Sequence, residues 1–117
     1  MVAEKNKSEE DPRMDKTVRF RVRLKDNIAD VKIMIFHPME TGYRKNKHTA
    51  EIIPKHFIHT VKIGHNGKPI MEVHWSRSVS KNPYLNFRVP NAVIGDELSI
   101  AWDDNMGESG AGTTTIS

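Results

Sequence analysis

The sequence predicts an all-β fold: an immunoglobulin-like antiparallel β-sandwich of about seven strands. Three observations support this prediction. Short segments alternate apolar and polar residues, as half-buried strands do, and clusters of Asn, Asp, Gly and Pro separate these segments. No segment of useful length shows the helical period of about 3.6 residues. The 117 residues suffice for one domain with one hydrophobic core.

The first two predicted strands are joined by a short turn. Apolar residues alternate with Arg and Lys through residues 17–25, and Asp26 and Asn27 are expected to form the turn. The second strand is predicted at residues 28–36. Pro38 then ends it, because proline cannot donate a ladder hydrogen bond.

The remaining predicted strands are separated by polar connections. We expect them at residues 57–63, 70–75, 84–89, 98–102 and 113–116. Long polar loops are expected at residues 38–55 and 76–83. We interpret the charged, apolar-poor residues 1–16 as a disordered tail and residues 17–117 as the β-sandwich domain.

The turn at residues 65–67 can be built in two registers. A two-residue loop would place His59 opposite His74, close enough to share a metal ion. A three-residue loop pairs Val61 with Met71 instead, and we favour it because register follows the hydrophobic pattern. That register gathers five apolar residues on one face: Val61, Ile63, Met71, Val73 and Trp75.

Other candidate chemistry is weak. The absence of cysteine excludes disulfides, thiolate nucleophiles and iron–sulfur clusters. His56 and His59 would point apart on a strand, because their spacing is odd. Asp103 and Asp104 precede a turn, where we expect Asp to bond to the local backbone. We therefore predict no catalytic, cofactor-binding or metal-binding residue, and no enzyme activity.

Charge is spread along the chain, whose net charge is +3. The stripe Arg19, Arg21, Arg23 and Lys25 admits two interpretations: a solvated or edge-protecting strand face, or a surface that steers an acidic partner. We favour the first, because alternation alone accounts for it. Neither a dense basic face nor a long apolar segment is evident, so no nucleic-acid or membrane partner is predicted.

Two loops are rich in side chains that suit recognition, and loops on a rigid scaffold are where function concentrates. One follows the second strand, and the other precedes the strand at residues 84–89. The candidate partner-binding residues in them are His37, Met39, Glu40, Tyr43, Arg44, Lys81, Asn82 and Tyr84.

Five segments, in order, resemble the SoxZ family of bacterial thiosulfate oxidation, which contributes the Z subunit of the SoxYZ sulfur carrier. They are HPMETGYRK (residues 37–45), IPKHFI (53–58), HNGK (65–68), SKNPYLNF (80–87) and WDDNMGE (102–108). Together the matching segments fall within residues 18 to 116. The charged residues before Thr17 and the small residues from Ser109 depart from the family pattern.

This resemblance implies a β-sandwich subunit without a cofactor that forms a heterodimer with SoxY. SoxY holds sulfur intermediates on a cysteine in a flexible C-terminal arm, and this chain has no cysteine. The resemblance further implies transient docking to other Sox enzymes, a periplasmic location and co-export with SoxY. Self-association without SoxY is left open. The alternative is a metal-binding redox enzyme on an immunoglobulin-like sandwich.

Overall fold

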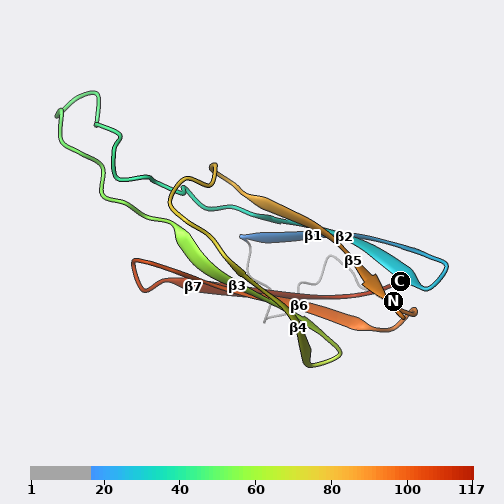
Figure 1. The fold of residues 1–117 in the computed structure, drawn as a ribbon. Coiled ribbons are helices and arrows are strands. Elements are labelled where there is room, and N and C mark those ends of the chain that lie inside the picture. Colours follow the sequence, from blue (N-terminus) through green and yellow to red (C-terminus); the bar gives the residue numbers. More distant parts are fainter. Residues whose placement is uncertain (1–16) are drawn as a thin grey trace.

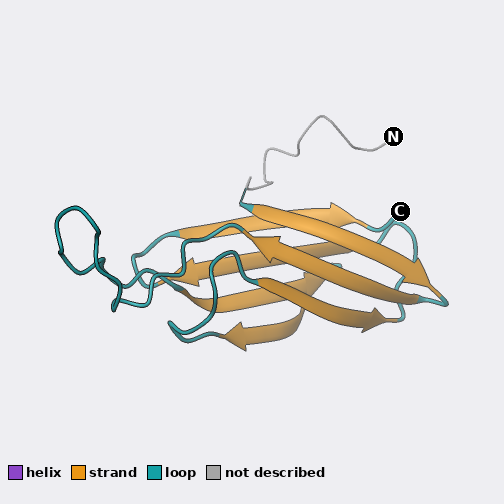
Figure 2. Cartoon of the chain, turned by 90° about the horizontal axis from the view of Figure 1, so that it is seen from above, coloured by secondary structure: helices purple, strands orange, loops and turns teal. Residues whose placement is uncertain are grey.

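The computed structural model describes residues 17–117, so the predicted N-terminal tail lies outside the described residues. Two antiparallel sheets pack face to face, which confirms the predicted sandwich (Figures 1 and 2). The strands are β1 (Val18–Lys25), β2 (Ile28–Ile35), β3 (Ile58–His65), β4 (Lys68–His74), β5 (Tyr84–Pro90), β6 (Glu97–Asp104) and β7 (Ser109–Thr115). None of the described residues forms a helix that could cross a membrane.

One sheet has the order β1-β2-β5 and the other β4-β3-β6-β7. Alternate residues of the strands point into the space between the sheets, as the alternating pattern predicted. The inward residues on β2 and β3 are almost fully buried, with Val31, Ile33, Val61 and Ile63 at most 1% exposed. Each such side chain stabilises the fold by about 1.5–3 kcal/mol, so this interior holds the two sheets together. Trp102 is buried in it, and Trp75 packs against it, as the predicted apolar face of the hairpin requires.

The β3–β4 hairpin corrects the predicted register. Its turn has two residues, Asn66 and Gly67, both with positive φ, and the strands pair from His65 opposite Lys68. Such turns match the right-handed twist of the strands. A register shift between Ile63 and Gly64 then pairs Ile63 with Met71 and Val61 with Val73, rather than Val61 with Met71. The five apolar residues still face the core, because the shift restores the alternation that the shorter turn would have broken.

The last strand begins at Ser109, earlier than the predicted start at residue 113. The segment from Ser109 to Gly112 carries only small side chains, so it offers no alternation for a sequence reading to detect. Its pairing with β6, from Asp103 opposite Ser109, holds it in the sheet.

The sandwich has two distinct ends. We call the end with the β3–β4 turn, residues 91–96 and Ile116 the turn end. The opposite end, with residues 36–57, residues 75–83 and the β6–β7 turn, is the loop end. There the chain leaves β2, projects as a finger closed by a bridge between Lys45 and Ile52, and returns to β3 (Figure 1).

Candidate functional site

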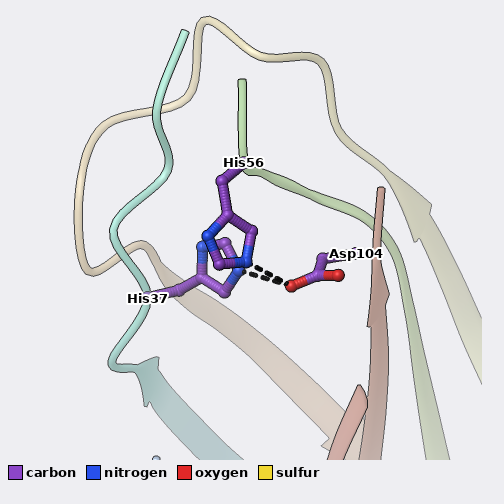
Figure 3. Close-up of side chains that lie close together, drawn as sticks. All are labelled: His37, His56 and Asp104. Atoms are coloured by element: carbon purple, nitrogen blue, oxygen red, sulfur yellow. Dashed lines mark hydrogen bonds and ion pairs between the residues drawn. The ribbon is translucent and has the colours of Figure 1, made fainter. Parts of the chain in front are cut away.

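The centre of the loop end is the carboxylate of Asp104, the last residue of β6. Its Oδ2 accepts hydrogen bonds from Nε2 of His37 at 3.0 Å and Nε2 of His56 at 2.8 Å (Figure 3). Its Oδ1 accepts the backbone N–H groups of Met106 and Glu108, both at 2.9 Å. A carboxylate offers about four acceptor positions, so these four bonds occupy them all. We call His37, His56 and Asp104 the His–Asp hub.

The hub keeps its carboxylate ionised. Burial raises the pKa of Asp104, because desolvation disfavours charge. The bonds from His37 and the Glu108 amide lower that pKa. The bonds from His56 and the Met106 amide lower it further, and the net pKa lies below the ordinary 3.8. With its acceptor positions filled, this carboxylate is poorly placed to act as a general base.

The hydrogen bonds of His37 determine which ring nitrogen carries its proton. Its Nδ1 accepts the backbone N–H of Met39 at 3.0 Å. A nitrogen that accepts carries no hydrogen, so the hydrogen-bond network assigns the proton of the neutral ring to Nε2. That proton is donated to Asp104. His37 is 4% exposed, and both of its ring nitrogens form hydrogen bonds within the protein. Neither nitrogen is therefore available to a substrate.

Two reciprocal backbone clamps bring the loops to the hub. The N–H of His37 donates to Oδ1 of Asn82 at 3.1 Å, and the N–H of Asn82 donates to the carbonyl of His37 at 3.0 Å. Likewise Glu40 and His56 exchange N–H to carbonyl bonds of 2.7 and 3.0 Å. The two histidine rings meet edge to face with centroids 4.5 Å apart. Segments far apart in the chain are thereby joined at one point.

Asn105, in the β6–β7 turn, fastens the returning strand. The N–H of Phe57 donates to its Oδ1 at 2.7 Å, its own N–H donates to the carbonyl of Phe57 at 3.1 Å, and its Nδ2 donates to the carbonyl of Lys55 at 3.0 Å. Three bonds from one residue satisfy backbone groups that have no sheet neighbour there.

The loops reach this arrangement through left-handed backbone. Met39 has φ +49° and Asn82 φ +51°. Asn tolerates that region, whereas Met adopts it at a cost. The Met39 side chain is buried, and its Sδ accepts the N–H of Ile58 at 3.3 Å. Gly42 has φ +88°, and a Cβ there would lie 3.0 Å from Cβ of Lys55, so the turn needs glycine.

The hub also resembles a metal site by distance, because the two histidine nitrogens and the Asp104 oxygen lie within 4.8 Å of one another. Glu108 adds an oxygen 3.2 Å from His56. A metal-binding histidine normally donates its second ring N–H to an acceptor. His37 does the reverse by accepting the Met39 amide, so its Nε2 keeps the proton and cannot coordinate. The hydrogen bonds therefore do not fit a metal ion.

The predicted partner-binding residues fall into two groups. His37 and Met39 are buried, and Asn82 is half-buried in its clamp, so these three organise the loops. The side chains of His37 and Met39 form internal hydrogen bonds, and their direct contact with a partner stays a prediction.

The remaining five predicted residues reach the surface, and their contact with a partner stays a prediction. Glu40 is half-buried and accepts a two-pronged ion pair from Arg44, at 3.1 and 2.6 Å, which lowers the pKa of Glu40. Tyr43 is 70% exposed and bonds to Arg77, whose guanidinium stacks on its ring. Lys81 and Tyr84 are exposed and line a shallow groove.

That groove has a volume of about 400 Å³ and is lined by Trp75 and residues 79–85. It lies beside the Asn82 clamp, so the hub that orders the loops also shapes the groove.

Sequence reasoning missed the hub itself. The two histidine pairs considered from the sequence, His59 with His74 and His56 with His59, do not include His37, which converges with His56 on Asp104. The expected bonding of Asp104 to its local turn is confirmed through Oδ1, while Oδ2 serves the histidines. One signal was available: His37 directly follows a predicted strand, His56 directly precedes one, and Asp104 lies two residues beyond the end of another. The alternating strand directions bring those strand ends together.

Fold and site together define a class of protein: a small β-sandwich domain whose loops are fastened by a saturated hydrogen-bond hub. The family model of the sulphur oxidation protein SoxZ matches residues 18–115. The chain belongs to the SoxZ family. No curated protein matches the chain in a sequence comparison.

Proposed function

We propose that this chain is the non-catalytic Z-type subunit of a sulfur-carrier complex in thiosulfate oxidation. It pairs with a SoxY partner, whose cysteine carries the sulfur covalently. Its loop end helps to dock the carrier on the enzymes that load, oxidise and release the sulfur. Membership of the SoxZ family supports the pathway, and the lack of cysteine in this chain is in keeping with a carrier cysteine on its partner.

The observation that carries the proposal is the saturation of the hub. A loop end rich in histidine and carboxylate groups is where chemistry would be expected, yet Asp104 and His37 use their polar atoms to hold loops together. The exposed side chains of Tyr43, Arg44 and Tyr84 are of the types enriched in protein interfaces.

The docking role is tested with the Tyr43→Ala/Arg44→Ala variant, purified with SoxY. We expect weaker affinity for SoxY or for at least one Sox enzyme, measured by calorimetry, because interface Tyr and Arg contribute strongly to binding. The matched control is Lys62→Ala, which changes an exposed residue in the middle of β3, and this variant should bind normally. Unchanged affinities for every partner would remove these residues from the docking surface.

The alternative, a metal-binding redox enzyme, rests on the short distances within the hub. It is tested by adding Zn²⁺, Cu²⁺ or Fe²⁺ to the full chain and measuring bound metal and melting temperature. We expect neither stoichiometric binding nor stabilisation, since His37 keeps its proton on Nε2. Stoichiometric binding that Asp104→Asn abolishes would favour the metalloenzyme instead.

We further propose that the chain works in the periplasm, exported together with SoxY. Family membership is the support for this location. Expression with and without SoxY, followed by fractionation, tests it: the chain should reach the periplasm only when SoxY is present.

A further inference from the structure

The outer face of the β1-β2-β5 sheet concentrates positive charge. Strand register arranges its residues in four rows across the sheet. Six cations and one carboxylate point outward, and the face alone therefore carries more positive charge than the net +3 of the whole chain. The charged residues are Arg19, Arg21, Arg23, Lys25, Asp30, Lys32 and Arg88. We call this surface the basic face.

The cations of the basic face have no carboxylate partner among the described residues. All six are exposed, and none of them forms an ion pair within residues 17–117. The outer face of the other sheet differs, because one row across it pairs Lys62 with Glu72 and continues through the small residues Ala101 and Ala111. Charge is therefore segregated to one side of the sandwich.

Protection of sheet edges does not account for the whole pattern. Charged residues on β1 and β5 can discourage strand pairing at the edges. Lys32, however, lies on the central strand β2 and is directly opposite Arg21 on β1. Like charges in that position destabilise a sheet. This pair does not stabilise the fold, which favours a role for the two cations in binding a partner.

One end of the basic face turns apolar and aromatic. Met34 and Tyr84 share the row of Arg19 and are 39% and 63% exposed. Phe36 follows at 38% exposed, with the Arg19 guanidinium 5.5 Å from its ring centroid. Tyr84 also lines the groove at residues 79–85. Arg, Met and aromatic residues are the types enriched in protein interfaces, and four of the six cations are Arg.

We propose that the basic face is a docking surface for an acidic protein partner. Its charge complements carboxylates, and its apolar row gives the bound partner a place to bury side chains. Eight-residue strands span about 26 Å, and three strands lie about 4.8 Å apart, so the face is smaller than the roughly 800 Å² a stable complex buries on each side. The surface therefore speeds encounter and is sensitive to salt.

The test uses the full chain and a poly-L-glutamate peptide as the acidic protein probe, with single-stranded DNA and anionic lipid vesicles as competing probes. The variant is Arg21→Gln/Lys32→Gln. Its matched control is Lys62→Gln/Lys68→Gln, which removes the same charge from the other sheet. Affinity is measured at low and high salt, and urea unfolding of all three proteins is measured alongside.

We expect the Arg21→Gln/Lys32→Gln variant to bind the peptide about tenfold more weakly at low salt, while the control stays within about twofold. The variant should be at least as stable as the wild type, because it loses a repulsive pair. Equal weakening in variant and control would overturn the proposal, and so would tighter binding of DNA or vesicles than of the peptide. Because no sulfur-oxidation protein takes part, failure here leaves the proposed carrier role untouched.

Discussion

The two ends of the sandwich are held together by the same two hydrogen-bonding arrangements, which differ in how deeply they are buried. The first device is an asparagine clamp. At the loop end Asn82 exchanges two hydrogen bonds with the backbone of His37. At the turn end Asn66 exchanges two bonds of 2.8 Å with the backbone of Glu97. Both asparagines are left-handed, with φ of +51° and +52°. Each end thus uses a residue that tolerates this backbone and supplies its own acceptor.

The second device is a histidine bonded to an aspartate. At the turn end Asp96 accepts Nε2 of His65 at 2.8 Å and the N–H of Val93 at 3.0 Å. At the loop end Asp104 accepts two histidines and two amides. The Asp104 side chain is fully buried, whereas that of Asp96 is 13% exposed.

The difference follows from how much irregular chain each end must hold. The turn end joins strands through short connections, and backbone bonds such as Ala92 to Asn27 and Gly95 to Ile116 tie these connections to one another. The loop end must secure residues 36–57 and 75–83, which lack sheet neighbours over most of their length. A buried carboxylate that accepts four bonds satisfies several of those groups at once. The same chemistry therefore joins short turns at one end and anchors the long loops at the other.

The largest expected effect is the loss of the loop-end carboxylate. Asp104→Ala leaves the buried Nε2–H of His37 and two amides without a hydrogen-bond acceptor, so the free energy of unfolding should fall by about 3 kcal/mol. Asp96→Ala should cost less, because water can replace its bonds. Urea unfolding measures both. The exposed neighbour variant Asp103→Ala should change little, and equal losses for Asp96→Ala and Asp104→Ala would break the contrast between the ends.

A smaller effect separates backbone strain from hydrogen bonding in the clamps. Asn82→Ala loses the bond to His37 and forces alanine into left-handed backbone, so it should cost about 2 kcal/mol. Asn82→Gly loses the bond but relieves the strain, and should cost about 1 kcal/mol. Asn66→Ala and Asn66→Gly should follow the same order at the turn end. If glycine proves the worse substitution at either site, left-handed strain is not what selects Asn there.

The sequence was sufficient for the fold because alternation records which face of a strand is buried. For the same reason the sequence correctly predicted which residues of the β3–β4 hairpin face the core, but it did not predict how the two strands pair. The shift near Ile63 and Gly64 depends on the twist of the turn, which no alternation reports. The start of β7 was missed because glycine, alanine and serine carry no such pattern.

The hub could not be read from spacing, because its members lie 67 and 48 positions from Asp104. No short motif joins them. Their meeting depends on which strand ends share one end of the sandwich, and on the hydrogen bond from the Met39 amide that holds the His37 ring. A sequence reading that had first placed each polar residue by strand direction would have gathered His37, His56 and Asp104.

The smallest expected effect appears only at acid pH. It tests the difference between the partly exposed Asp96 and the buried Asp104. Hydrogen bonds from the Val93 amide, His65 and Asn66 lower the pKa of Asp96 from 3.8 to about 2. Because the unfolded chain then binds more protons than the folded one, stability falls as pH drops from about 4 to about 2. Asp96→Asn should flatten this acid limb of the unfolding midpoint and leave neutral pH little changed. Asp104→Asn should lower stability at neutral pH, because its amide nitrogen cannot accept from two histidines, and the deficit should shrink in acid, where protonation of the wild-type Asp104 weakens the same bonds. An acid limb that Asp96→Asn leaves as steep as in the wild type would mean that the turn-end pair does not couple to folding.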